Sequence, residues 1–394
     1  MNNEQTVIKP DKSYRKTYVL KQQTPMIHFQ HADSGVVIRA SEFKPKLDKF
    51  LLKKLVKKLD NDLEGKKNWF LKQADGNQDI KAFNYKVRIF ATGKPKRNQN
   101  INKMYFANMG KDSSDQLQTI FYETDIYVEI QCFVKELLEY IDANISEFLL
   151  VTNFGTRQSK GFGCFDLKKE NDNVNTPIDI LKDNKYDFVY CEVENPKKAL
   201  NVAAGIYAVM KGGVNFSNTY VKGYIQRQYL NDIGKKNIGS DKAFIKAEIL
   251  PAIQRKIEKG SDNFQKYDGY EYVRAILGVP ESIGFRDPNS KQQVTVSING
   301  KNDGIERFQS AIQIVVSGKY VILIMKDSYT DILEKKFVFS TKIGNGTINE
   351  TINVPSEFNP EKFLSGFVNY FNNEKSKLEN LKYVKLIDVS EVKN

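Results

Sequence analysis

Two histidines, His28 and His31, are the only imidazoles of the chain, and they lie three residues apart. A pair of imidazoles can cleave RNA by acid–base catalysis, in which one removes the 2′-OH proton and the other protonates the leaving oxygen. On a strand, positions i and i+3 point to opposite faces, so a bend is needed to bring the two rings together. A metal site would need more ligands than the nearby Asp33, so we expect no metal and no cofactor. Histidines that are structural, or that stack on RNA bases, are the alternative.

A glycine-rich segment at 154–163, FGTRQSKGFG, encloses the cations Arg157 and Lys160. Glycines allow the backbone to approach a ligand closely and expose N–H groups that suit phosphate oxygens. The segment is not a P-loop, because Phe162 follows Gly161 where a P-loop has lysine and then serine or threonine. The functional interpretation is a phosphate-binding loop, and the alternative is a hairpin turn with two solvated cations.

A third segment, residues 24–46, predicts a strand that leads through a short turn into the start of a basic helix. Backbone amides at such a helix start, together with nearby cations, can hold an anion. The side chains that would converge there are Arg39, Ser41, Lys44 and Lys46. An ordinary connection between a strand and a helix is the alternative.

The stretch 93–111 contains cations around Tyr105 and Phe106 and has no acidic residue. Cations beside aromatic rings are typical of surfaces that bind single-stranded RNA, since the bases stack and the phosphates pair. We take Lys94, Lys96 and Arg97 as candidate RNA contacts. A flexible, exposed loop is the alternative.

The elements that would position these residues follow one order in the N-terminal half, β-α-β-β-α-β, which is typical of a ferredoxin-like fold. The predicted elements are strands at 17–29, 82–91 and 120–130, helices at 44–60 and 133–141, and a strand pair at 147–153 and 161–167. The second half repeats parts of this order with more insertions. A polar stretch with Pro177 separates the halves. We therefore predict an α+β protein of two ferredoxin-like (RRM-related) domains with inserted loops, at 1–168 and 186–394, joined by a linker at 169–185.

The composition of the chain limits the class of protein to which it can belong. The chain has 394 residues and a net charge of +12, which is compatible with RNA binding but also with a general excess of lysine. No apolar run is long enough to span a membrane, and the first residues lack the apolar core of a signal peptide, so we expect a cytoplasmic protein without a membrane partner. The three cysteines show no spacing typical of metal sites or disulfide frameworks.

The segments at 24–46 and 154–163 together resemble the RAMP superfamily of CRISPR-associated proteins, over residues 17–167. The likeness is greatest to the large capping subunit of the type III-B (Cmr) effector complex. This resemblance implies ferredoxin-like domains and a guide RNA held by its backbone. It would place Arg39, Ser41, Lys44 and Lys46 near phosphates, and Gly155, Arg157, Gln158, Lys160, Gly161 and Gly163 along the loop side of the RNA. Some relatives cut target RNA with an aspartate after the first strand, which implies a possible role for Asp33.

Our hypothesis is therefore a non-catalytic, RNA-binding RAMP subunit of a type III CRISPR effector complex, with guide RNA and other effector subunits as partners in antiviral and anti-plasmid defence. The alternative is a metal-independent endoribonuclease that processes precursor guide RNA with His28 and His31. A structural protein whose charge reflects coding bias is the third possibility.

Overall fold

The computed structural model describes residues 14–27, 38–60, 63–71, 82–98, 119–168, 175–216, 219–249, 267–286, 293–300, 303–305, 307–343 and 346–389. The chain divides into two compact units, which are described separately. Unit 1 comprises residues 1–101, 116–158 and 162–184, and unit 2 comprises residues 102–115, 159–161 and 185–394. Within the described residues, no helix is both long and apolar enough to cross a membrane.

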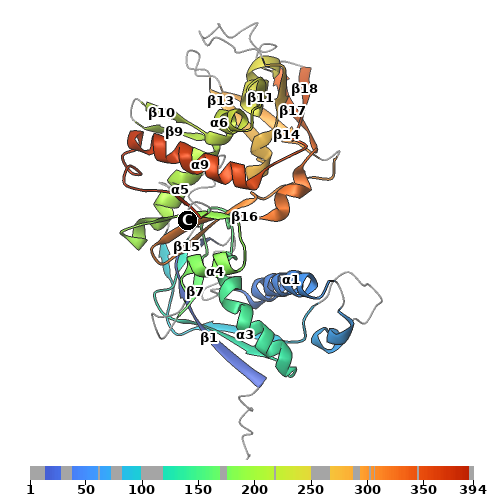
Figure 1. The fold of residues 1–394 in the computed structure, drawn as a ribbon, viewed down its shortest axis with the longest axis vertical. Helices are drawn as coiled ribbons and strands as arrows, with labels where there is room; N and C mark the ends of the chain where they lie inside the picture. The colour runs from blue at the N-terminus through green and yellow to red at the C-terminus, as the bar shows by residue number, and fades with distance from the viewer. Residues whose placement is uncertain are drawn as a thin grey trace, which may run out of the picture. The chain divides into compact units, whose positions relative to one another are not determined.

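Unit 1 is built on an antiparallel four-stranded sheet with the order β3-β6-β1-β7. Its strands are β1 (Arg15–Gln22), β3 (Lys86–Ala91), β6 (Ile126–Gln131) and β7 (Phe165–Leu167), and its long helices are α1 (Ala40–Lys58) and α3 (Lys135–Leu150). In chain order these elements run β-α-β-β-α-β (Figure 1). A second, three-stranded sheet has the order β2-β5-β4, from Met26–Ile27, Thr119–Phe121 and Lys96–Asn98. The unit also contains the 3-10 helix η2 (Glu64–Trp69) and α4 (Pro177–Asp183).

The core of unit 1 follows from the periodicity of its elements. Strand β6 alternates buried Ile126, Val128 and Ile130 with half-buried side chains on the other face. Helix α1 buries Phe43, Leu47, Leu51 and Leu55 at helical spacing, and α3 supplies a similar apolar stripe. These faces form one continuous hydrophobic cluster, so the two helices and the sheet are held by a single core.

The structure corrects several predicted boundaries in unit 1. The strand predicted at 147–153 is wrong, because α3 continues through Leu150 with Ile145, Phe148 and Leu149 still facing the core. The single strand predicted at 120–130 is two strands in different sheets, β5 and β6. The predicted strand at 17–29 likewise ends at Gln22, and Met26–Ile27 form the separate β2. The stretch at 169–185, predicted as a linker, contains α4, which Thr176 and Asp179 cap reciprocally at its start.

Unit 2 repeats the same succession around a second antiparallel sheet, of order β15-β16-β8-β19. The elements are β8 (Phe188–Glu192), α5 (Ala199–Lys211), β15 (Ile312–Ser317), β16 (Tyr320–Met325), α9 (Pro360–Glu374) and β19 (Ile387–Asp388). The edge strand β15 receives one more neighbour from far away in sequence. Lys160 forms a parallel bridge with Ile314, and the Ile314 N–H donates to the carbonyl of Ser159 at 3.2 Å.

Two insertions enlarge unit 2 beyond this repeat. The first, between α5 and β15, holds the hairpin of β9 (Gly213–Phe216) and β10 (Thr219–Lys222), followed by α6 (Tyr224–Asp232), β11 (Ile238–Ser240), α7 (Asp241–Phe244), the π-helix η4 (Ile245–Ile249), β12 (Gly269–Glu271), η5 (Val273–Leu277), β13 (Ser282–Arg286) and β14 (Gln293–Asn299). The second, between β16 and α9, holds η7 (Asp327–Ile332), β17 (Lys336–Ile343) and β18 (Gly346–Asn353). Strands from both insertions form a six-stranded sheet, β11-β12-β18-β17-β14-β13. The short helices η3 (Pro196–Lys198) and η8 (Lys375–Lys377) flank α5 and α9.

Candidate nucleic-acid interface

In unit 1, the strand β2, the start of α1 and the glycine segment lie against one another. The N–H of Thr156 donates to the carbonyl of Ile27 at 2.9 Å, and the N–H of Gly163 donates to that of Pro25 at 3.0 Å. Glu42 joins the start of α1 to the glycine segment, because its Oε1 accepts a hydrogen bond from the N–H of Gly155 at 2.9 Å. The two segments identified in the sequence therefore meet in unit 1, and we call this meeting point the cradle.

The glycines of the cradle are required by packing inside the protein. Gly155 and Gly163 have left-handed φ values of 79° and 70°. A Cβ on Gly163 would lie 1.9 Å from the carbonyl oxygen of Phe154, and one on Gly155 would lie 2.7 Å from that of Ile27. Gly161 also has a positive φ, of 82°, but a Cβ there would meet only ordinary contacts. The glycine pattern thus fixes the shape of the loop by close backbone contact.

Two of the predicted phosphate contacts, Lys44 and Lys46, use their ammonium groups within unit 1. Lys44 donates to Asp48 at 2.7 Å and to the carbonyl of Phe83 at 2.9 Å. Lys46 donates to Glu42 at 2.7 Å and to the carbonyl of Asn153 at 2.8 Å. Burial lowers the pKa of Lys46, which its partner Glu42 opposes. In this arrangement both lysines connect α1 to its surroundings and hold the cradle together.

The start of α1 presents Arg39 and Ser41. Arg39 is the N-cap residue and its side chain makes no capping hydrogen bond, and the exposed Ser41 lies within the first turn rather than at the cap position. The first N–H groups of an uncapped helix suit an anion. In the loop, Arg157 is half-buried with a left-handed φ of 57°, and burial lowers its pKa to about 10, so it is charged at neutral pH. Gln158 donates through Nε2 to the carbonyl of Gly155 at 2.5 Å.

The other predicted residues fall elsewhere. Lys160 belongs to unit 2, where its Nζ lies 5.6 Å from the centre of the Tyr207 ring. Lys94 and Lys96 are exposed, and Lys96 pairs with Glu123 at 2.7 Å. Arg97 lies in β4. His28, His31 and Asp33 lie outside the described residues. Within the described part of the chain, no group of three or more His, Cys, Asp or Glu residues could hold a metal ion.

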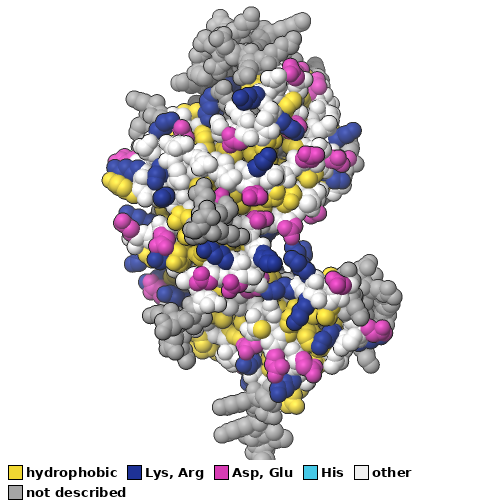
Figure 2. Space-filling view, in the orientation of Figure 1, with side chains coloured by type: hydrophobic (Ala, Val, Ile, Leu, Met, Phe, Trp, Pro, Cys, Tyr) yellow, Lys and Arg dark blue, Asp and Glu magenta, His cyan; other side chains and the backbone are white. Residues whose placement is uncertain are grey.

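Sequence reasoning missed the residues that organise the cradle from within, chiefly Glu42, Asn153 and Phe154. Asn153 is buried and donates to the carbonyl of Gln158 at 2.6 Å, while Phe154 stacks on Phe43 with ring centres 5.7 Å apart. The spacing of Glu42 and Lys46, four residues apart on a helix, is the one signal that could have predicted an ion pair. On the face shown in Figure 2, Lys and Arg side chains are interspersed with Asp and Glu, so charge alone does not mark the site.

Comparison with models of known protein families shows the family of this chain. The Cmr1 N-terminal domain matches residues 13–214, and the Cmr1 C-terminal domain matches residues 220–392. The chain belongs to the Cmr1 family. This confirms the resemblance to RAMP proteins of type III-B systems that the two sequence segments indicated. The boundary between the two Cmr1 domains falls within the β9–β10 hairpin of unit 2, so the N-terminal Cmr1 domain includes α5.

Solved structures give distant likenesses to this Cmr1-family chain. The crystal structure of apo Cmr1 from Pyrococcus furiosus matches with 11% identity and a TM-score of 0.38, over 89% of this chain and 96% of that one. A chain in the cryo-EM structure of the type III-B Cmr-β bound to cognate target RNA matches with 15% identity and a TM-score of 0.27, over 39% of this chain. The match spans 58% of that chain, less than two thirds of its length. No curated protein matches the sequence.

Proposed function

We propose that this Cmr1-family chain is a subunit of a type III-B CRISPR effector complex that holds guide RNA by its backbone at the cradle. The observation that carries the proposal is the contact through Glu42, which joins the start of α1 to a loop 113 residues away. This contact brings the start of α1 beside the loop that carries Arg157. Backbone amides and arginines at one place suit phosphate oxygens, and phosphate contacts give affinity without sequence preference.

The roles of the individual residues follow from their partners. We assign phosphate contact to Arg39, Ser41 and Arg157. Lys44 and Lys46 position the helix start, since their ammonium groups bond to Asp48, Glu42 and main-chain carbonyls. The glycines and Gln158 set the path of the loop, and exposed Lys94 and Lys96, at and just before β4, would offer further phosphate contacts, for which Lys96 would have to leave Glu123.

The topology supports a ferredoxin-like assignment for each unit. Both sheets place the first and third strands at the centre and the second and fourth at the edges, with antiparallel neighbours throughout. Each set of strands is interleaved with two helices in the order β-α-β-β-α-β. The repeat is still recognisable in unit 2, because each insertion lies between two of its elements. One insertion lies between α5 and β15, and the other between β16 and α9.

The test is the salt dependence of RNA binding by the full chain. Fluorescence anisotropy with a labelled single-stranded RNA, measured between about 50 and 300 mM KCl, gives the slope of log K against log salt. Each lost phosphate contact flattens this slope by about 0.7 and costs about fivefold in affinity near 0.1 M salt. The double variant Arg39→Gln/Arg157→Gln should therefore flatten the slope by about 1.4 and bind about 25-fold more weakly.

The matched control is Arg15→Gln, because Arg15 is an exposed arginine of the same unit that pairs with Glu129 at 3.7 Å on β6. The control should bind RNA as the unchanged protein does. An unchanged chain that binds no RNA, or a double variant with the original slope, contradicts the proposal. Cleavage of the RNA during the titration, lost in His28→Ala, would favour the endoribonuclease instead.

A further inference from the structure

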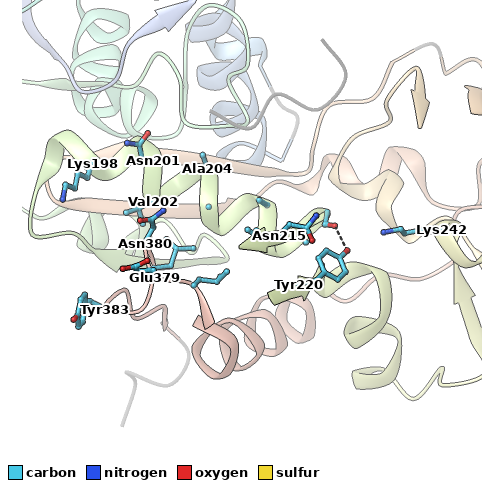
Figure 3. Close-up of a pocket in the computed structure, with 17 residues that line it drawn as sticks. Lys198, Asn201, Val202, Ala204, Asn215, Tyr220, Lys242, Glu379, Asn380 and Tyr383 are labelled. Atoms are coloured by element: carbon cyan, nitrogen blue, oxygen red, sulfur yellow. Dashed lines mark hydrogen bonds between the residues drawn. The ribbon is translucent and has the colours of Figure 1, made fainter. Parts of the chain in front are cut away.

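Unit 2 contains a long groove beside α5, separate from the cradle of unit 1. Its cavity has a volume of about 1210 Å³. One stripe of α5 forms a wall, with Asn201, Gly205 and Ala208. The β9–β10 hairpin with Tyr220, Lys242, and residues 378–381 and 383 also line the groove (Figure 3). Gly205 allows this close approach, since a Cβ there would lie 2.9 Å from Cδ1 of Leu381. The groove therefore lies where α5 packs against the segment that contains Leu381.

Exposed tyrosines lie at separate places along the groove, and each has a lysine over its ring. Tyr220 is 42% exposed, and the Nζ of Lys242 lies 5.7 Å from its ring centre. Tyr383 is 86% exposed, and the Nζ of Lys382 lies 4.9 Å from its ring centre. Figure 3 shows Tyr383 and Lys242 at opposite ends of the lining. An exposed ring with a cation beside it can stack a base and pair the adjoining phosphate.

The end of the groove at Tyr220 and Lys242 has a concentration of positive charge. The charges that act on Lys242 are the positive ones of Arg274 and Lys246 and the negative one of Asp241. Asp241 already forms an ion pair with Arg274. Burial and the neighbouring cations lower the pKa of Lys242. This excess of cations over carboxylates is costly in a partly buried site, and a bound anion would reduce that cost.

We propose that this groove binds a segment of single-stranded RNA, with a phosphate at the Tyr220–Lys242 end and bases stacked on Tyr220 and Tyr383. The proposal rests on the proposed function, because it gives the same ligand a second contact surface within unit 2. RNA fits the groove better than an apolar peptide does, since the exposed rings are paired with lysines and the charge excess lies at one end. Lys246 and Arg274 act on Tyr220 electrostatically, which places them around the same ring.

The experiment compares variants of the full chain in the same anisotropy titration. Lys242→Gln/Lys246→Gln, which removes the charges facing the one phosphate placed there, should flatten the salt slope by about 0.7 and weaken binding about fivefold near 0.1 M salt. Tyr383→Leu removes an exposed ring and should weaken binding by about tenfold, within the range expected for one base stack. The matched control is Lys336→Gln, an exposed lysine on β17 outside the groove lining, which should bind as the unchanged protein does.

Photocrosslinking provides a direct readout. RNA that carries 4-thiouridine should crosslink to the peptides that contain Tyr220 or Tyr383, and the crosslinks should disappear in Tyr220→Leu and Tyr383→Leu, respectively. Unchanged binding and slope in the groove variants, while Arg39→Gln/Arg157→Gln still weakens binding, overturn the groove proposal alone. Failure of the unchanged chain to bind RNA overturns both proposals. Groove variants that bind RNA normally but fail to join other effector subunits would assign the groove to a protein partner and overturn the RNA proposal.

Discussion

Replacement of Gly163 by alanine should destabilise unit 1 strongly, because two independent costs add at this position. The left-handed φ of 70° costs an alanine about 1–2 kcal/mol. Its Cβ would also lie 1.9 Å from the carbonyl oxygen of Phe154, a backbone atom that cannot rotate away. Relief of this overlap would disturb the hydrogen bonds from Phe154 N–H to the Gly163 carbonyl and from Gly163 N–H to Pro25, which contribute about 1 kcal/mol each. We expect a loss of about 4 kcal/mol in the free energy of unfolding.

The assay can report on unit 1 alone. Trp69 is the only tryptophan of the chain, and it is 4% exposed within the core of unit 1. Guanidinium chloride unfolding followed by its fluorescence should show a lower midpoint for Gly163→Ala at an unchanged slope. Gly65→Ala is the control, because no described atom lies within 4 Å of a Cβ there and its φ is not left-handed; we expect no loss and a gain of about 0.4–1 kcal/mol. A loss below about 1 kcal/mol for Gly163→Ala, or equal losses in both variants, would refute the reasoning.

Three further predictions concern stability. Gln22→Leu removes a buried amide that donates to the carbonyls of Thr24 and Ile120 and accepts from the N–H of Tyr122, so Trp69 fluorescence should show a loss of about 3 kcal/mol or more. A Cβ at Gly318 would have no described atom within 4 Å, but the φ there is 56°, so for Gly318→Ala far-UV circular dichroism should show a loss of only about 1 kcal/mol. Desolvation and the carboxylates of Asp327 and Glu361 raise the pKa of Asp187 above its unfolded value, so its ionised form disfavours folding at neutral pH. Asp187→Asn should therefore stabilise unit 2 at pH 7, and this difference should shrink as the pH falls below the raised pKa toward the unfolded value of 3.8; a constant difference across that range would contradict the assignment.

Helices and strands whose apolar residues recur at one regular spacing could be predicted from the sequence. Leu47, Leu51 and Leu55 recur every four residues, and α1 buries all three. Short apolar runs were harder, because Phe148-Leu149-Leu150 fits a buried strand as well as the last turn of a helix. The break between β5 and β6 depends on the side chain of Gln22, about 100 residues away, which bonds to Ile120 and Tyr122. No local pattern contains that information.

The candidate site could be predicted in its location but only partly in its chemistry. The meeting of the helix start with the glycine loop was implied by the resemblance to RAMP proteins. The bonds of Lys44 and Lys46 to main-chain carbonyls could not be predicted in this way, because they depend on Phe83 and Asn153, far away in sequence, being within reach of the ammonium groups. A lysine's sequence neighbours do not show whether its ammonium group meets solvent or a carbonyl.

The bridge between Lys160 and Ile314 limits where the chain can be divided. A fragment that begins at residue 185 would keep all strands of the second four-stranded sheet but would lose Ser159–Gly161 from the edge of β15. All six residues of β15 are buried, so the loss would expose an apolar strand with open N–H and C=O groups. Such edges pair readily with other chains. The isolated C-terminal half should therefore aggregate on expression, whereas the same half supplied with a peptide of residues 154–163 should remain dispersed.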